Sequence, residues 1–338
     1  MKRPVAAPKT TFANGTASIA VMAAVMAAVM AAVVFAALTL ASCSASNSAA
    51  TAADGRKTIV VTYSILGSLV QDLAGDQFRV VTLIPNGLDV HEWEPSAKDI
   101  ETLNHADLVV ENGLNLEGGM GKALSQARAA GLKFFTASDY IAVRHVAAGE
   151  GIPSGDPDQA LGAADPHIWT NPENMKAIVD ALAPVLQKDF GSTLADGGAG
   201  LASRREALDQ KLDALDAQIR AEVATLPSAS RKLVTGHESL GYFAQHYGFK
   251  LIGAVIPSIS TEAESSAADL ADLDKLIAAN GVKVIFTELG TPPATVKALA
   301  DQAKVRTVTL ITHYLPPDGS YFTFERNLAT AIITGLRS

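Results

Sequence analysis

LASRREALDQKLDALDAQIRAEVATL, residues 201–226, is the stretch that decides the fold of this chain. Its large apolar residues recur at gaps of mostly three and four, which places them on one face of a helix. They are Leu201, Leu208, Leu212, Leu215, Ile219, Val223 and Leu226. A helix of about 28 residues is roughly 40 Å long, which is enough to run along two lobes. We therefore predict one long linking helix over residues 198–226.

Short β-rich runs alternate with helical patterns on both sides of this helix. Before it lie runs such as RVVTLIP (79–85) and DLVVENG (107–113), and after it RKLVTGH (231–237) and VKVIFTELG (282–290). Such alternation indicates parallel sheets with helices on their faces. The predicted fold class is therefore α/β, with two lobes that are each a mainly parallel sheet flanked by helices. The predicted N-terminal lobe spans residues 58–197 and the C-terminal lobe residues 227–338.

The composition excludes several classes of protein. The chain has 338 residues, 48% of them hydrophobic, and a net charge of -8, which suffices for two compact domains. Its sequence has no Lys and Arg cluster that could follow a phosphate backbone, so no nucleic-acid partner is expected. With Cys43 as its one cysteine, a single chain can form neither a disulfide framework nor a cysteine metal cage.

The N-terminus carries the parts of a secretory signal. A basic start is followed by an uncharged apolar run from Ile19 to Leu40 and by Leu-Ala-Ser-Cys, ending at Cys43. This order resembles a bacterial lipobox, in which Cys43 becomes the lipidated first residue of the mature protein. The alternative is an uncleaved transmembrane anchor. We expect residues 1–43 to be a lipoprotein signal peptide and residues 44–57 a flexible tether, with the rest of the chain extracytoplasmic and anchored to the cell membrane.

Four of the seven histidines lie in loops beyond predicted strands or at the start of a predicted helix. They are His91, His167, His237 and His313. Open α/β sheets gather ligand groups beyond the carboxyl ends of their strands, so four such histidines, two per lobe, are predicted to converge on the cleft between the lobes. Their spacings of 76, 70 and 76 residues (91 to 167, 167 to 237 and 237 to 313) are too long for a local motif. Because neutral imidazole is a good ligand for divalent transition metals, the pattern predicts a metal site.

The remaining three histidines are predicted to have surface or packing roles. His105 lies within a predicted helix, His246 on the helix after His237, and His145 in a loose stretch rich in Gly, Asp and Pro.

Several motifs in combination resemble one protein family. VHEWEPS (90–96), ADLVVENGLNLE (106–117), DPHIWTNP (165–172) and TGHESLGYFAQHYGF (235–249) look like the metal-binding solute receptors of bacterial ABC importers. The resemblance runs from about Ile59 to the C-terminus and covers the zinc and manganese lipoproteins of high-affinity uptake systems. It implies two α/β lobes joined by one rigid helix, and a monomeric, non-enzymatic receptor that delivers a divalent metal to an ABC permease.

The family's metal ligands correspond to His91, His167 and His237 of this chain, with the fourth falling at His313. Relatives often carry a carboxylate at this fourth position, where this chain reads Ile-Thr-His-Tyr-Leu. We expect His313 to replace the carboxylate. The alternatives are that Asp318, Glu288 or a water completes the coordination.

The type of ligand favours Zn²⁺, because an all-imidazole set suits zinc whereas manganese prefers carboxylates and higher coordination numbers. A manganese receptor of the same family is the alternative. Four neighbouring carboxylates are candidates to orient the imidazoles or to offset the metal's charge, unless they are exposed or cap turns. They are Glu92, Asp165, Glu238 and Glu288.

A zinc hydrolase is the rival from another class. It needs an open coordination position and a general base beside a bound water. Glu92 or Glu238 could act as that base, but the sequence has no HExxH motif and four protein ligands would close the site. An additional adhesin role is left open.

Overall fold

The computed structural model describes residues 55–147, 150 and 161–337. Arg56 begins a compact unit that runs to the C-terminus. The predicted signal peptide, its lipobox Cys43 and nearly all of the predicted tether lie outside the described residues. Within the described ranges, no helix is both long enough and apolar enough to cross a membrane.

The first half of this unit is built on a four-stranded parallel sheet with the strand order β2-β1-β3-β4. The strands are β1 (Lys57–Val61), β2 (Phe78–Thr82), β3 (Leu108–Glu111) and β4 (Phe134–Thr136). The helices of this half are α2 (Ser64–Ala74), α3 (Ala97–Asn104), α4 (Gly121–Ala129) and α5 (Pro172–Phe190). β3 is buried throughout and β1 from Ile59 to Val61, and these buried positions are mostly apolar, as expected for a parallel sheet covered on both faces.

The second half contains two parallel strand pairs, β5 with β6 and β7 with β8. The strands are β5 (Lys232–Thr235), β6 (Lys250–Ala254), β7 (Val284–Thr287) and β8 (Arg306–Thr309). The helices are α7 (Gly241–Tyr247), α8 (Ala267–Asn280), α9 (Pro293–Ala303) and α10 (Tyr321–Arg337). The sequence predicted one sheet here. Instead β5 and β7 lie side by side without a continuous ladder, and the register of β5 on β6 shifts between Leu233 and Val234.

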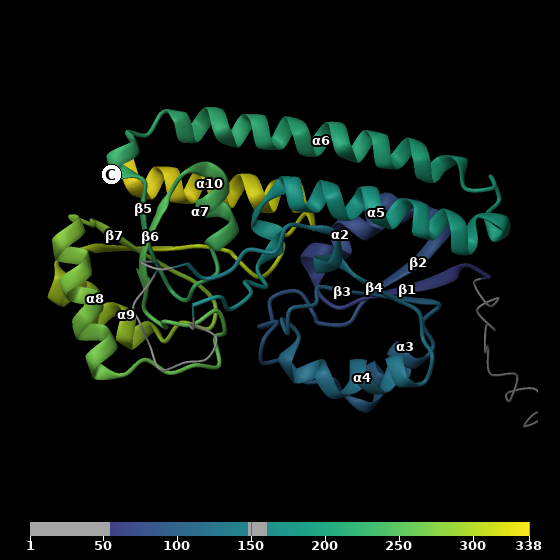
Figure 1. The fold of residues 1–338 in the computed structure, drawn as a ribbon, viewed down its shortest axis with the longest axis horizontal. Helices are drawn as coiled ribbons and strands as arrows, with labels where there is room; N and C mark the ends of the chain where they lie inside the picture. The colour runs from purple at the N-terminus through teal and green to yellow at the C-terminus, as the bar shows by residue number, and fades with distance from the viewer. Residues whose placement is uncertain (1–54, 148–149, 151–160, 338) are drawn as a thin grey trace, which may run out of the picture. The chain divides into compact units, whose positions relative to one another are not determined.

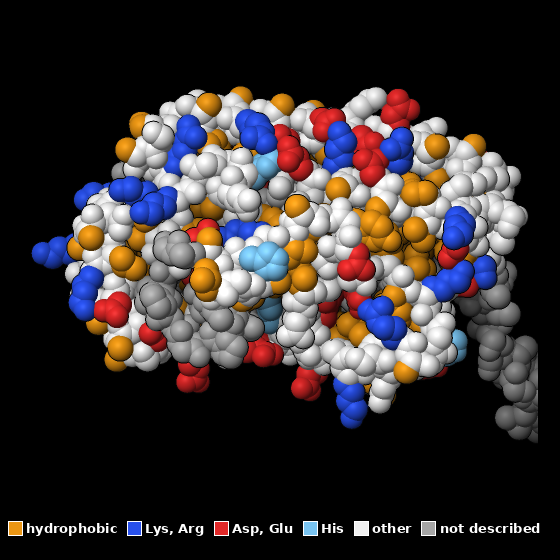
Figure 2. Space-filling model, viewed as in Figure 1, with side chains coloured by type: hydrophobic (Ala, Val, Ile, Leu, Met, Phe, Trp, Pro, Cys, Tyr) orange, Lys and Arg blue, Asp and Glu red, His pale blue; other side chains and the backbone are white. Residues whose placement is uncertain are grey.

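The long helix α6 spans Ala199–Ala224 and packs against α5 and α2 of the first half and against α10 (Figure 1). The residues it buries are those predicted from the spacing: Leu201, Leu208, Leu212, Leu215, Ile219 and Val223. Acidic and basic side chains are interspersed along the top of Figure 2, where α6 lies, as expected for a solvated surface. The predicted helix is confirmed, although it ends two residues before Leu226, because Thr225 is its C-cap.

Helices α3 and α8 begin in the same way in the two halves. Ser96 and Asp99 form a capping box at α3, and Ser266 and Asp269 form one at α8. These caps fix where the preceding loops end. The loop before α3 carries His91.

The remaining helical segments are short 3-10 turns. They are η1 (Gly75–Gln77), η2 (Gly118–Met120), η3 (Ala137–Tyr140), η5 (Ile168–Thr170), η6 (Gly191–Thr193) and η7 (Ser228–Ser230). The turn η5 follows His167 directly and leads into α5, whose N-cap Asn171 accepts a hydrogen bond from the N–H of Glu173.

Candidate metal site

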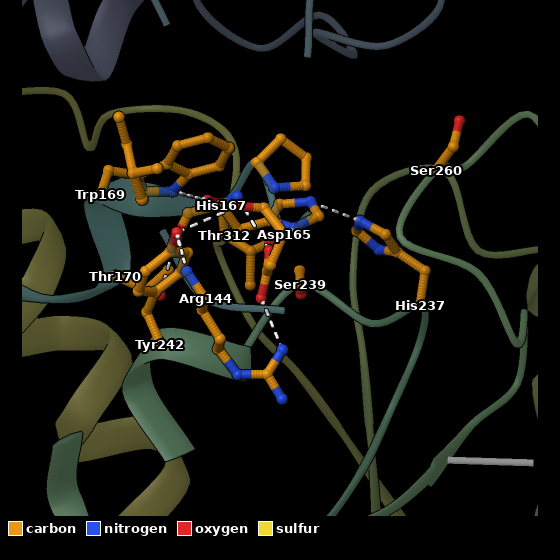
Figure 3. A network of polar contacts seen from close by, with 12 residues as sticks. Arg144, Asp165, His167, Trp169, Thr170, His237, Ser239, Tyr242, Ser260 and Thr312 are labelled. Carbon is orange, nitrogen blue, oxygen red and sulfur yellow. Dashed lines mark hydrogen bonds and ion pairs between the residues drawn. The ribbon is translucent and has the colours of Figure 1, made fainter. Parts of the chain in front are cut away.

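The four histidines predicted from strand ends converge on one point in the structure. One ring nitrogen from each of His91, His167, His237 and His313 lies within 4.8 Å of the others. All four side chains are buried, with His91 the most exposed at 3%. Nε2 of His167 lies 3.3 Å from Nε2 of His91 and 3.2 Å from Nε2 of His237, the pair that Figure 3 shows facing each other.

Each histidine is positioned by a loop that leaves a strand or enters a helix. His91 lies between β2 and α3, where its backbone N–H donates to Oδ1 of Asp89 at 3.0 Å. His167 immediately precedes η5. His237 follows β5 by two residues and His313 follows β8 by four. The predicted loop positions, three beyond strands and one before a helical turn, therefore bring the rings together.

Two carboxylates set the tautomers of the central rings. Nδ1 of His167 lies 2.9 Å from Oδ1 of Asp165, and Nδ1 of His237 lies 3.0 Å from Oε1 of Glu288. An ionised carboxylate can only accept, so each Nδ1 carries the proton and each Nε2 presents a lone pair toward the cluster. Oε2 of Glu288 also accepts from the hydroxyl of Ser239 at 2.7 Å, which holds this carboxylate in place.

The fourth ring has an unsatisfied nitrogen. Nδ1 of His313 lies 2.7 Å from the hydroxyl oxygen of Thr312. Its Nε2 is buried and has no hydrogen-bond partner among the described residues. A buried polar atom without a partner is costly and therefore needs an explanation. A cation at the centre of the four rings would satisfy it.

Two of the nitrogen separations match those of a tetrahedral metal site. With Zn–N bonds of about 2.0–2.1 Å, the ligand nitrogens of a regular tetrahedron are about 3.3–3.4 Å apart. The measured Nε2 separations of 3.3 Å and 3.2 Å agree with this value.

Burial keeps three of the rings neutral. It lowers the pKa of His91, His167 and His313 well below the usual value, and the neighbouring ring of His237 lowers each further. Burial acts on His237 in the same direction, but the charge of Glu288 and the hydrogen bond to it outweigh burial and raise the pKa overall. Burial likewise favours protonation of Glu288, yet His237 holds the pKa of Glu288 below its usual value.

A buried ion pair supports the loop of His167. Nη1 of Arg144 lies 3.0 Å from Oδ2 of Asp165 (Figure 3). Burial raises the pKa of Asp165 to about 6, although Arg144 opposes that shift. The hydroxyl of Tyr242 accepts from the backbone N–H of Arg144 at 2.9 Å and donates to the carbonyl of Asp165 at 3.2 Å. Sequence reasoning missed Arg144, because its sequence neighbours carry no sign of a carboxylate partner 21 residues away.

The other predicted carboxylates lie outside the four-imidazole cluster. Glu92 is exposed. Glu238 is buried next to His237, and its backbone N–H donates to the carbonyl of Ser258. Asp318 is exposed, and its Oδ1 accepts from the N–H of Ser320 at 3.2 Å. Of the carboxylates proposed to orient the rings, Asp165 and Glu288 each bond an imidazole nitrogen of the cluster.

The three remaining histidines also lie outside the cluster. His105 is the C-cap of α3, not a mid-helix residue as expected, and its Nδ1 lies 2.7 Å from the carbonyl oxygen of Glu101. His145 forms an isolated bridge with Ala164. His246, on α7, lies 2.6 Å from Oδ1 of Asp216 on α6.

A cavity of about 520 Å³ borders the cluster on the side of His91. Its lining includes Leu116, Pro166, Ile259 and the carboxylate-bearing Glu262.

Two α/β halves bridged by a long helix, with four buried imidazoles gathered at one point, define a metal-binding receptor of the solute-binding class. The chain belongs to the ZnuA family, zinc-uptake complex component A, periplasmic, whose model matches residues 59–335. Members of this family are metal-binding substrate receptors of ABC importers and are not enzymes.

Individual relatives are named for different metals. The chain is 33% identical over 260 residues to the zinc-binding protein TroA of Treponema pallidum, covering 75% of this chain and 77% of that protein. It is 28% identical over 261 residues to the manganese-binding lipoprotein MntA of Bacillus subtilis, covering 77% and 80%. The solved structure of the periplasmic zinc-binding protein TroA superposes with a TM-score of 0.70 at 28% identity, over 83% of this chain and 99% of that one. Similarity therefore indicates a divalent transition metal, and the relatives are periplasmic proteins or lipoproteins.

Proposed function

We propose that this receptor captures Zn²⁺ outside the cytoplasm and delivers it to the permease of an ABC importer. The proposed ligands are His91, His167, His237 and His313. The observation that carries the proposal is the burial of four imidazoles with one ring nitrogen of each within 4.8 Å of the others. Such a set has few uses in a folded core other than holding a cation.

Zinc is favoured over manganese by the donor atoms. The cluster consists of four imidazoles, and among the described residues no carboxylate oxygen belongs to it. Neutral nitrogen donors suit zinc, whereas manganese prefers carboxylate oxygens and higher coordination numbers. A manganese receptor is the second candidate, because the similar protein MntA is named for that metal.

The proposal extends to the parts of the chain that precede the fold. Lipidation at Cys43 anchors the receptor to the membrane, and residues 44–57 act as its tether. We further propose that it works as a monomer whose lobes, residues 58–197 and 227–338, are joined by the linker of residues 198–226.

Calorimetric titration of metal-stripped protein with Zn²⁺ and with Mn²⁺ tests the proposal. We expect one Zn²⁺ per chain and weaker binding of Mn²⁺. The His313→Ala variant should lose at least about tenfold in zinc affinity, because it removes one of four ligands. The control is His105→Ala, whose ring lies on the exposed end of α3. Tighter binding of Mn²⁺, or an unchanged zinc affinity in His313→Ala, contradicts the assignment.

A further inference from the structure

The segment between β8 and α10, residues 310–320, carries His313 and belongs by chain order to the second half of the fold. The N–H of Leu310 at its start donates to the carbonyl of Thr287 on β7 at 2.7 Å, but the bonds that follow attach the segment to the first half. Nδ2 of Asn86, in the loop after β2, donates to the carbonyl of Leu315 at 2.9 Å, and Oδ1 of Asn86 accepts from the N–H of Leu315 at 2.7 Å. These two bonds from one side chain to the backbone N–H and C=O of one residue fix both the position and the orientation of this segment.

Further bonds attach the same segment at both its ends. The hydroxyl of Ser68, on α2, donates to the carbonyl of Gly319 at 2.9 Å and accepts from the N–H of Tyr321 at 3.2 Å. The indole N–H of Trp169, in η5, donates to the carbonyl of Thr312 at 2.8 Å, one residue before His313. The ring of Trp169 also contacts the ring of His313, with 5.6 Å between centroids.

His237 is held quite differently. Its backbone N–H and its Nδ1 both bond Oε1 of Glu288 at 3.0 Å, and Glu288 is fixed by Ser239, so this ring is anchored to the second half. Beside the site, the hydroxyl of Tyr242 on α7 links that half to the loop of His167, through Arg144 and Asp165. Among the bonds of the described residues, moving His237 away breaks those of this hydroxyl and the 3.7 Å contact between Nδ1 of His246 on α7 and Oε2 of Glu173 on α5. Moving His313 away from His91 breaks the bonds of Asn86, Ser68 and Trp169.

We propose that Asn86 and Ser68 are positioning residues that keep His313 with His91 and His167, so that separation of the two halves withdraws His237 alone. Three imidazoles therefore stay together in the first half and one moves with the second half. Chain order alone suggests two imidazoles in each half. Release then begins with the loss of one ligand, which opens one coordination position while three rings retain the ion. This inference rests on the proposed zinc-binding function.

Amide hydrogen exchange on the whole protein, with and without bound Zn²⁺, distinguishes the two groupings. The N–H of Arg144 bonds Tyr242 across the halves, whereas the N–H groups of Leu315 and Tyr321 bond Asn86 and Ser68. On zinc removal we expect the Arg144 amide to lose protection and the Leu315 and Tyr321 amides to keep it. Loss of protection at Leu315 and Tyr321, or no change at any of the three, overturns the proposal. Because zinc binding by wild type is measured separately, failure here leaves the proposed function standing.

A double-mutant comparison tests whether Asn86 acts through His313. Competition with a chromogenic chelator gives the Zn²⁺ dissociation rate, which we expect to rise about fivefold in Asn86→Ala. The control is Asn280→Ala, whose Nδ2 likewise donates to a backbone carbonyl, that of Leu276 at 2.9 Å on α8. In a His313→Ala background the effect of Asn86→Ala should disappear, whereas it should persist in His237→Ala. An equal effect of Asn86→Ala in both backgrounds overturns the positioning role.

Discussion

Replacing Glu288 by Gln removes one charge from the site while keeping the shape of the side chain. Oε1 of Glu288 accepts from both the backbone N–H and Nδ1 of His237 at 3.0 Å. The amide oxygen of Gln can accept the same bonds, and its NH₂ can donate to the hydroxyl of Ser239, which now donates to Oε2 at 2.7 Å. Glu288→Gln therefore tests the charge on its own.

The expected loss of zinc affinity in Glu288→Gln is about 10–100-fold, or about 1.4–2.7 kcal/mol. The reason is that the carboxylate makes the ring of His237 more basic and offsets part of the metal's charge within a buried site. Glu288 is fit for this role because His237 keeps its pKa below the usual value, so the carboxylate is ionised at neutral pH.

Calorimetric competition with a chelator measures this difference. Glu92→Gln is the matched control, because Glu92 is exposed and its pKa is raised by partial burial and by the charges of Asp89 and Glu262. We expect Glu92→Gln to bind zinc as wild type does. Our reasoning about Glu288 fails if Glu288→Gln binds zinc within about twofold of wild type, or if the two variants weaken binding equally.

Two further predictions concern pH. Ligand imidazoles must be deprotonated, and the pKa of His237 is raised by Glu288, so acidification protonates His237 first. Calorimetry should show zinc affinity falling by up to about tenfold per pH unit between about pH 7.5 and about pH 5.5. A zinc affinity that does not change with pH contradicts this prediction. Burial raises the pKa of Glu117 to about 7, so the folded protein favours the protonated form of this side chain. The folded protein therefore loses stability as the pH rises from the unfolded-state pKa of Glu117 toward about 7. The free energy of unfolding of Glu117→Gln should therefore be higher than that of wild type by up to about 3 kcal/mol at about pH 8, but not at about pH 5, as measured by urea unfolding. If the free energies of unfolding of the two proteins change in parallel with pH, the prediction is refuted.

Local patterns predicted the elements of the fold. The spacing of Leu212, Leu215 and Ile219 predicted the buried face of α6, because the helical period is a property of the nearby chain. Short β-rich runs predicted the strands β2 and β3 for the same reason. What the patterns missed is the division of the second half into two strand pairs, because pairing between strands is decided by packing between distant segments.

The sequence by itself determined which side chains are available to the site. Histidines at strand ends are visible in the chain, and the parallel α/β architecture brings such ends to the same side of a sheet. Only the tertiary structure decided how those rings are held. Asn86 and Leu315 are separated by 229 residues, and Glu288 and His237 by 51. No local period relates such residues, since their contacts form only when burial of the apolar faces has folded the whole chain.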